Sequence, residues 1–190
     1  DGTTAISNGM NNAIAVVAVA PEGCLLHAPD VYMKKIACGP AARGQIQLDD
    51  SVENNIKRVS EAVGKSPEDI TVSVLDRPRH DDLIQEIRKT GARIRKISDG
   101  DIVTAIYTCF DESGIDLIMG VGGAPEGVVA AAALKCLGGD FQGRLVHYDD
   151  AQLSRIEKSP AEEGKIYTID DLVRGDDVIF SATGVSNGDL

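Results

Sequence analysis

The spacing of apolar residues differs from one stretch of the chain to the next. Residues 12–32 alternate small and branched side chains on both sides of a Pro-Glu-Gly turn. This pattern predicts an antiparallel hairpin, with Gly23 in the positive-φ conformation that a tight turn requires. After a polar stretch, residues 51–67 show the spacing of an amphipathic helix. We expect this helix to be capped by Ser51 and to end at Gly64.

From residue 68 onward the rhythm becomes an alternation of short apolar runs and longer periodic segments. The apolar runs predict strands, and the segments with apolar residues at helical spacing predict helices. The expected strands are 69–76, 92–98, 116–123 and 143–148, and the expected helices are 80–91, 99–110 and 125–139. Strict alternation of this kind implies a parallel sheet with right-handed crossovers. Residues 176–185 predict a further strand that returns to the first sheet.

These patterns give an α/β fold class with two layered α/β units. We expect residues 1–66 to form part of a first α/β domain, which contains the hairpin and the first helix. Residues 67–150 are expected to form a second α/β domain with a mostly parallel sheet. Residues 151–190 then supply a connection and the strand that returns to the first domain.

Several of the expected strands end in unusual polar sequence. In a parallel sheet, ligands bind beyond the carboxyl ends of the strands. The polar strand ends are Asp76–His80 (DRPRH), Ser98–Asp101 (SDGD) and Gly122–Gly127 (GGAPEG). If the sheet is parallel, all of them lie on one rim, so we expect their side chains to meet in one pocket.

The first of these loops carries an arginine on each side of a proline. Pro78 stiffens the loop and keeps Arg77 out of the helical region. Arg77 and Arg79 can each donate a pair of hydrogen bonds to one phosphate group, which favours a phosphate-binding role. The alternative is an ordinary solvated loop with surface arginines.

The second loop places Asp99 and Asp101 at a strand end and a helix start. One of these aspartates can simply cap the helix. Alternatively, both carboxylates accept hydrogen bonds from the hydroxyl groups of a sugar. The residues alone leave both interpretations open.

The third loop contains glycines and a glutamate but matches neither common phosphate-binding motif. Pro125 stands where a dinucleotide fingerprint has its third glycine, and the Lys-Ser/Thr pair of a P-loop is absent. Glu126 falls in the first turn of the next helix, where it either complements the helix dipole or acts as a ligand for a hard metal. A similar choice holds for Asp1 and Thr3, which either form a turn or bind a metal and orient water.

Composition narrows the range of partners. The net charge is −11, from 30 acidic and 19 basic residues, which disfavours binding to nucleic acid or to an anionic membrane. An anionic substrate would need metal ions or local arginines to reverse the field.

The four cysteines include no C-x-x-C pair, which favours unpaired thiols in a reducing cytosol. The sequence has no apolar run of membrane-spanning length and no signal peptide, and its two ends read as cuts within a domain.

Several segments taken together resemble the class II fructose-1,6-bisphosphatases, including the cyanobacterial enzymes that also act on sedoheptulose 1,7-bisphosphate. The segments are DGTT, APDVYMKK, DRPRH, ISDGD and GVGGAPEGVVAAAALKCLGG, in the order in which that family has them. The resemblance implies a layered α-β-α-β-α fold of the metal-dependent sugar phosphatase type. It also implies a cytoplasmic homo-oligomer, a dimer or tetramer, that uses Mn²⁺ or Mg²⁺ to hydrolyse the 1-phosphate of a sugar bisphosphate.

The resemblance also implies roles for individual residues. Asp1 and Glu126 match metal ligands, and Thr3 matches the residue that helps to activate the attacking water. The residues that match substrate contacts are Asp1, Gly2, Thr3, Tyr32, Arg77, Pro78, Arg79, Asp99, Gly100, Asp101 and Gly123. The family motif begins with a metal-binding Asp just before the position of Asp1, and further acidic ligands lie upstream. This chain contains none of them.

Alternatives to catalysis by this chain stay open. The chain could be a non-catalytic sugar-phosphate-binding fragment, or a phosphatase like inositol monophosphatase. A dinucleotide-binding module is disfavoured by the missing third glycine. Among the remaining polar residues, we expect His27 and His147 to be half-buried in strands, and Lys34 and Lys35 to lie on a surface.

Overall fold

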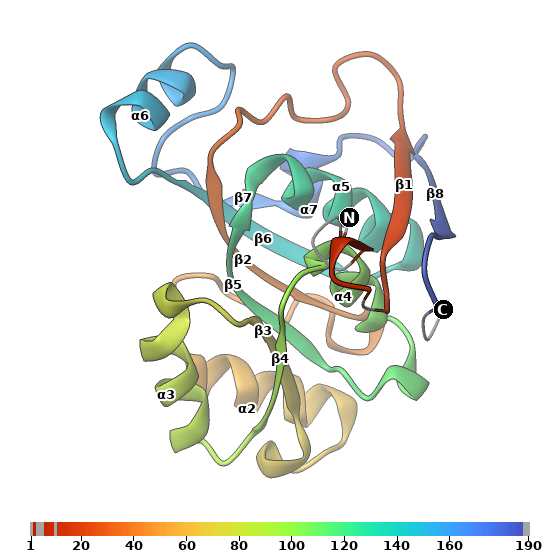
Figure 1. The fold of residues 1–190 in the computed structure, drawn as a ribbon. Helices are drawn as coiled ribbons and strands as arrows, with labels where there is room; N and C mark the ends of the chain where they lie inside the picture. The colour runs from red at the N-terminus through yellow and green to blue at the C-terminus, as the bar shows by residue number, and fades with distance from the viewer. Residues whose placement is uncertain (1, 3–5, 10, 188–190) are drawn as a thin grey trace.

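A computed structural model describes residues 2, 6–9 and 11–187 of the chain. In this part, the chain forms a six-stranded mixed sheet and a separate two-stranded sheet (Figure 1). The six strands are, in spatial order, β4 (Arg93–Ile97), β3 (Thr71–Leu75), β5 (Leu117–Gly123), β2 (Tyr32–Cys38), β6 (Asp140–Val146) and β7 (Tyr167–Thr168). The two-stranded sheet pairs β1 (Ile14–Val19) with β8 (Ile179–Gly184). The fold class is α/β, as the sequence predicts.

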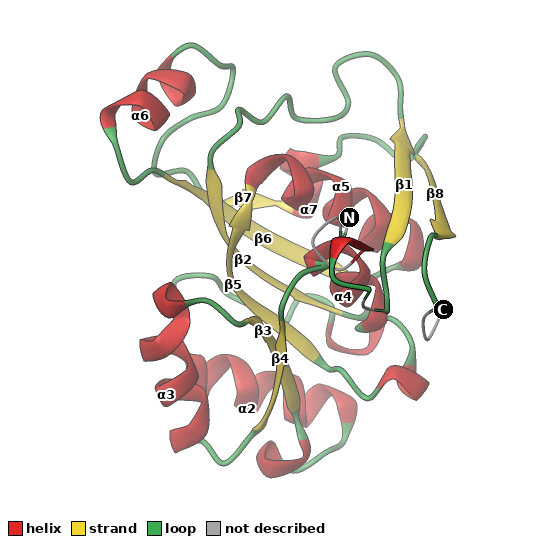
Figure 2. Ribbon diagram, in the orientation of Figure 1, coloured by secondary structure: helices red, strands yellow, loops and turns green. Residues whose placement is uncertain are grey.

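Helices cover both faces of the six-stranded sheet (Figure 2). They are α2 (Val52–Val63), α3 (Asp81–Lys89), α4 (Asp101–Tyr107), α5 (Ala124–Leu137), α6 (Asp150–Glu157) and α7 (Ile169–Leu172). α2 and α3 share one apolar cluster with the sheet, and α4, α5 and α7 share another. None of the helices in the described residues has both the length and the apolar character needed to cross a bilayer.

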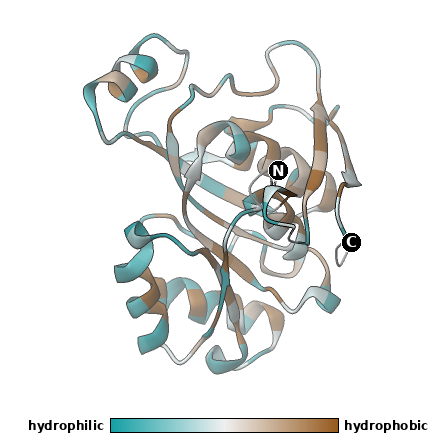
Figure 3. Ribbon diagram, viewed as in Figure 1, coloured by the Kyte–Doolittle hydropathy of each residue, from teal (hydrophilic) through white to brown (hydrophobic). Residues whose placement is uncertain are grey.

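The alanine-rich helix α5 lies between the two sheets. Its buried residues include the run Ala130–Leu134, and β1 and β8 pack against the same apolar cluster through Val16 and Phe180. Figure 3 shows hydrophilic residues on α3, at the outside of the fold, and hydrophobic residues along β1. A helix that is apolar around most of its circumference has to be buried on several sides, and α5 meets this condition by packing between two layers of strands.

The direction of the strands gives the large sheet one distinctive edge. β3 runs parallel to β4 and β5, whereas β2 runs antiparallel to both β5 and β6. Consequently β3, β4, β5 and β6 all point the same way, and the amino end of β2 lies at the edge where they end. Tyr32, the first residue of β2, pairs there with Gly123 and Val146. The sequence pattern did not predict this antiparallel insertion, and the domain boundaries at residues 66 and 150 stay predictions.

The hairpin predicted for residues 12–32 is wrong. β1 pairs with β8 near the other end of the described chain, so the last strand does return to the first one. Residues 24–31 form a loop. Its backbone is hydrogen-bonded to a distant segment: Leu26 N–H donates to Leu172 O, and Arg174 N–H donates to Cys24 O. His27 is exposed in this loop and not half-buried in a strand.

The first predicted helix agrees closely with the structure. Ser51 caps α2 by accepting a hydrogen bond from Asn54 N–H, and Gly64 ends the helix in the left-handed conformation with φ of 70°. By contrast, α6 and α7 were not predicted. His147 follows β6 directly and is half-buried, with Nε2 2.9 Å from Glu163 Oε1.

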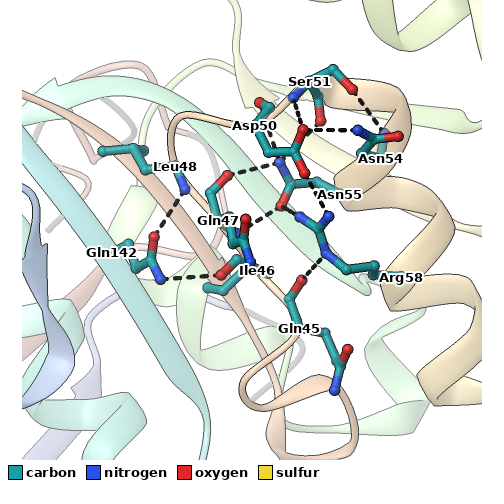
Figure 4. Close-up of polar contacts among 10 residues, drawn as sticks. All are labelled: Gln45, Ile46, Gln47, Leu48, Asp50, Ser51, Asn54, Asn55, Arg58 and Gln142. Carbon is teal, nitrogen blue, oxygen red and sulfur yellow. Dashed lines mark hydrogen bonds and ion pairs between the residues drawn. The ribbon is translucent and has the colours of Figure 1, made fainter.

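A polar network fixes the loop between β2 and α2 (Figure 4). Asn55 is fully buried, and its amide substitutes for a strand partner: Nδ2 donates to Gln47 O at 2.9 Å, and Oδ1 accepts from Gln47 N–H at 2.8 Å. Arg58 donates to the same Oδ1 and to Gln45 O. Gln142 of β6 holds the other side of the loop by bonding Ile46 O and Leu48 N–H.

Replacing Asn55 by Ala is expected to destabilise the protein by about 2–3 kcal/mol, because buried backbone groups of the loop lose their partner. Chemical denaturation in urea measures this change in the free energy of unfolding. The control is Lys57→Ala, at an exposed position of the same helix. Equal stability of the Asn55 and Lys57 variants would show that the network contributes nothing.

Candidate functional site

A pocket of about 510 Å³ lies at the edge where β3, β4 and β5 end. Each polar strand end predicted from the sequence contributes to it. The lining residues are Gly2, Tyr32, Leu75, Arg77, Arg79, Asp99, Asp101, Ile102, Gly122, Gly123, Pro125, Glu126 and Val129. The sheet topology explains this convergence, since the carboxyl ends of parallel strands meet at one edge.

Not every predicted site residue lines this pocket. Pro78 begins a short 3₁₀ turn, and Arg77 before it is extended, with φ of −138° and ψ of 144°, as a residue before proline prefers. Gly100 precedes α4 with φ of 86°, a conformation that favours glycine. Both residues therefore shape the loops and are absent from the lining. Asp1 and Thr3 lie outside the described residues.

Arg79 is held by contacts on two sides. Its guanidinium donates to Val121 O from Nε at 3.1 Å and from Nη2 at 2.8 Å. The same group lies over the ring of Tyr32, with Cζ 5.2 Å from the ring centre. The Tyr32 ring in turn makes an edge contact with Tyr148, which follows β6. Because these contacts preorganise the guanidinium at the pocket, less side-chain entropy is lost when it binds an anion.

His80 is a buried residue that links the arginine loop to β5. Its Nε2 accepts a hydrogen bond from Val121 N–H at 2.8 Å, so the ring proton is assigned to Nδ1, which donates to Leu75 O at 2.7 Å. The pKa of His80 lies below its ordinary value chiefly because burial disfavours the charged ring. The nearby Arg79 and Arg77 act in the same direction, whereas the Leu75 carbonyl and Asp81 oppose it. The imidazole therefore serves as a neutral structural bridge.

This lowered pKa predicts a loss of stability in mild acid. The unfolded chain takes up a proton at His80 near pH 6.5, whereas the folded protein takes it up only at lower pH. The free energy of unfolding should therefore fall as the pH drops below 6.5, by at most about 1.4 kcal/mol per pH unit from this group. In a His80→Gln variant, the free energy of unfolding, measured with urea at several pH values, should depend less steeply on pH. The exposed His27, changed to Gln, serves as the control, and equal slopes for the His80 variant and the parent would contradict the prediction.

The glycines at the end of β5 each make room for a polar side chain. A Cβ atom at Gly120 would lie 3.0 Å from His80 Nε2, one at Gly122 would lie 2.5 Å from Asp101 Oδ2, and one at Gly123 would lie 1.9 Å from Glu126 Oε2. Contacts below 3.0 Å require something to shift. The glycine-rich sequence GVGG thus accommodates side chains from three other segments of the chain.

Lys35 is not a surface residue, which corrects the sequence-based expectation. Only 5% of its side chain is exposed, and its Nζ lies 2.5 Å from Asp101 Oδ2, which is itself 12% exposed. Lys34, the preceding residue, is exposed as expected. The alternation of β2 gives no signal for this burial: Lys35 shares a strand face with the buried Met33 and Ala37, but the exposed Lys34 likewise shares its face with buried apolar residues of β2.

Glu126 is the described residue best placed to bind a metal. It lies in the first turn of α5 and lines the pocket. Its carboxylate offers the hard oxygen ligand that Mg²⁺ or Mn²⁺ prefers. Among residues 2, 6–9 and 11–187, no three His, Cys, Asp or Glu side chains converge on one point. The role of Glu126 as a metal ligand stays a prediction of the sequence.

A second cavity, of about 560 Å³, lies at the opposite edge of the sheet. It is bordered by Gly39, which follows β2, and by Asp116, which precedes β5. Lys65 and Asp116 form an ion pair at 2.6 Å on its wall. None of the predicted site residues that the structure describes lines this cavity, so the pocket at the strand ends is the candidate site.

Comparisons with known proteins match the chain to one family. The family model described as bacterial fructose-1,6-bisphosphatase, glpX-encoded, matches residues 1–190. A protein of Synechococcus sp. (strain JA-2-3B'a(2-13)), named D-fructose 1,6-bisphosphatase class 2/sedoheptulose 1,7-bisphosphatase, is 42% identical over 203 residues, covering 100% of this chain and 58% of that protein. Fructose-1,6-bisphosphatase 1 class 2 of Escherichia coli (strain K12) is 42% identical over 203 residues, with 100% and 60% covered. The chain thus spans about 58–60% of the length of these relatives. It belongs to the glpX-encoded family of bacterial fructose-1,6-bisphosphatases.

Proposed function

We propose that the full-length protein hydrolyses the 1-phosphate of fructose 1,6-bisphosphate, and also accepts sedoheptulose 1,7-bisphosphate. The observation that carries this proposal is the convergence of the arginine, aspartate and glutamate loops on one pocket at the edge of the sheet. Membership of the family supports it, and the names of the relatives in Synechococcus and Escherichia coli give the substrates.

The pocket divides into regions with different chemistry. Arg77 and Arg79 supply guanidinium groups for the phosphate that is not cleaved, and binding this phosphate orients the other one. Asp99 and Asp101 accept hydrogen bonds from hydroxyl groups of the sugar. Tyr32, the first residue of β2, borders the sugar, and Gly2 and Gly123 contribute to the lining of the pocket.

Glu126 and Asp1 would hold a divalent cation, Mn²⁺ or Mg²⁺. When bound, such a cation neutralises charge on the reacting phosphate and lowers the pKa of a bound water. Thr3 would position the attacking water by hydrogen bonding. Glu126 fits its role because the bare backbone at Gly123 lets its carboxylate lie directly against the end of β5. The cytoplasmic location and the dimeric or tetrameric assembly stay predictions of the sequence.

A second proposal concerns the 190-residue chain by itself, as a sugar-phosphate binder without catalysis. It is favoured by one observation: the described residues supply only a partial set of metal ligands. Binding without turnover is then the expected behaviour of this chain, while the full-length protein turns over.

Phosphate release separates these possibilities. The full-length protein and the 190-residue chain are each incubated with Mn²⁺ or Mg²⁺ and with fructose 1,6-bisphosphate, sedoheptulose 1,7-bisphosphate or inositol 1-phosphate. We expect the full-length protein to release phosphate from the two ketose bisphosphates and not from inositol 1-phosphate. Preference for inositol 1-phosphate would replace the proposal with an inositol monophosphatase-like activity. Absence of release from all three substrates would refute catalysis.

A further inference from the structure

The buried ammonium of Lys35 has no part in the proposed chemistry, although it lies beside the pocket. Lysine is among the residues least often buried, and a buried charge requires a partner. Lys35 is 5% exposed, and Asp101 is the partner, with Nζ 2.5 Å from Oδ2. Placing such a pair inside the protein carries a desolvation penalty that hydrophobic residues of similar size would avoid. Stability alone therefore does not account for the buried ion pair, which suggests that it has a function.

Lys35 connects separate parts of the pocket. Asp101 is the first residue of α4, and the same Nζ also donates to Gly123 O at 3.2 Å, at the end of β5. Lys35 itself belongs to β2. One cation thus joins the aspartate loop, the glycine segment and the strand that carries Tyr32.

Gly122 is matched to this ion pair. A Cβ atom at Gly122 would lie 2.9 Å from Lys35 Nζ and 2.5 Å from Asp101 Oδ2, distances that real Cβ contacts essentially never show. A side chain at this position would therefore press on the tips of the lysine and the aspartate, which would have to shift to make room. Glycine leaves the ion pair the space that it occupies.

We propose that Lys35 is a positioning residue for sugar recognition: it fixes the Asp101 carboxylate and compensates its charge, so that the remaining oxygen accepts a sugar hydroxyl. This proposal rests on the proposed function. Since Oδ2 is bound to the ammonium, Oδ1 is the oxygen left for the pocket, and its direction is set. An uncompensated carboxylate there would repel a bisphosphate, whereas the pair is close to neutral.

The first test is the Lys35→Met variant of the full-length protein, which keeps the length of the side chain and removes its charge. We expect the KM for fructose 1,6-bisphosphate to rise about tenfold or more, while kcat at saturation stays within about threefold. Lys34→Met is the matched control, because the neighbouring lysine is exposed. It should leave both constants unchanged. An unchanged KM in the Lys35 variant would overturn the proposal.

A merely structural role is separated by a destabilised control and by a double variant. Asn55→Ala lowers stability without removing a side chain that lines the pocket, and it should leave the KM unchanged. Removing Lys35 in an Asp101→Asn background should change the KM by less than about threefold, because the group through which Lys35 acts is already altered. This comparison also serves if the single Lys35 variant does not fold. The double variant buries no unpaired charge, and in the Asp101→Asn background the asparagine carbonyl oxygen can still accept a hydrogen bond from the ammonium. A tenfold effect in that background would show that Lys35 acts independently of Asp101, which would refute the proposal.

Failure of the proposed function has a different signature. If the unmodified full-length protein releases no phosphate, the activity is refuted, and the dissociation constant of fructose 1,6-bisphosphate, measured by calorimetry, takes the place of the KM. The same tenfold and threefold criteria then apply to the Lys35 variants. Absence of binding by the unmodified protein would refute the positioning role together with the function.

Discussion

Replacing Glu126 by Gln in the full-length protein is expected to weaken activation by the divalent cation about 10- to 100-fold. Glutamine has nearly the shape of glutamate and retains one carbonyl oxygen, but it lacks the negative charge that a hard cation prefers. The measurement is the rate of phosphate release as a function of Mn²⁺ or Mg²⁺ concentration. The midpoint of this titration should move to higher concentration, and the maximal rate should fall.

Two further variants sharpen this prediction. Gly123→Ala should move the midpoint of the titration in the same direction but less far, because the added Cβ atom would collide with Glu126 Oε2 and the flexible carboxylate would have to shift. Glu61→Gln, on the exposed side of α2, removes the same charge away from the pocket and should leave the titration unchanged. A metal titration of the Glu126 variant that matches the parent would rule out Glu126 as a ligand.

Replacing Arg79 by Ala is expected to raise the KM for fructose 1,6-bisphosphate about 10- to 100-fold, with a smaller effect on kcat. A charge-assisted hydrogen bond contributes about 1.5–3 kcal/mol, and a guanidinium can donate two such bonds to one phosphate. The expected loss is mainly in binding, because the phosphate that Arg79 holds is not the one that reacts. Steady-state kinetics at saturating metal measures both constants.

The design of the Arg79 experiment has to allow for the contacts that Arg79 makes within the protein. Arg79→Lys keeps the positive charge but loses the planar fork that bonds Val121 O, so an intermediate KM is expected. Arg88→Ala, at an exposed position of α3, is the control for the change in net charge. An unchanged KM in Arg79→Ala would refute the phosphate-binding role, whatever the lysine variant does.

The parts of the fold that sequence reasoning predicted are those with local signals. α2 was predictable because Ser51 and Gly64 mark its ends with capping chemistry. β3, β4 and β5 were predictable because each is a short apolar run followed by a helical segment. The return of β8 to the first strand was predicted, but its register was not, since Ile14 lies opposite Gly184 and no local pattern specifies such a long-range pair.

The position of the pocket was predictable because the pocket lies where the parallel strands end. The rule that carboxyl ends of parallel strands meet was enough to bring Arg79, Asp101 and Glu126 together, although their roles stay proposals. Lys35 was missed because its burial depends on the position of β2 between β5 and β6, a tertiary property. Nor did the sequence indicate that the neighbours of the β5 glycines are the side chains of His80, Asp101 and Glu126.

The position of β2 in the sheet also affects how the protein comes to fold during synthesis. Lys35 and Gly123 meet although they are 88 residues apart, so β2 leaves the ribosome long before either neighbour exists. In that interval, the apolar side chains of Met33 and Ile36 and both hydrogen-bonding edges of the strand have no sheet to join. The nascent chain must keep this strand from associating wrongly until β5 and β6 emerge, and ligand-binding competence can appear only after that late closure.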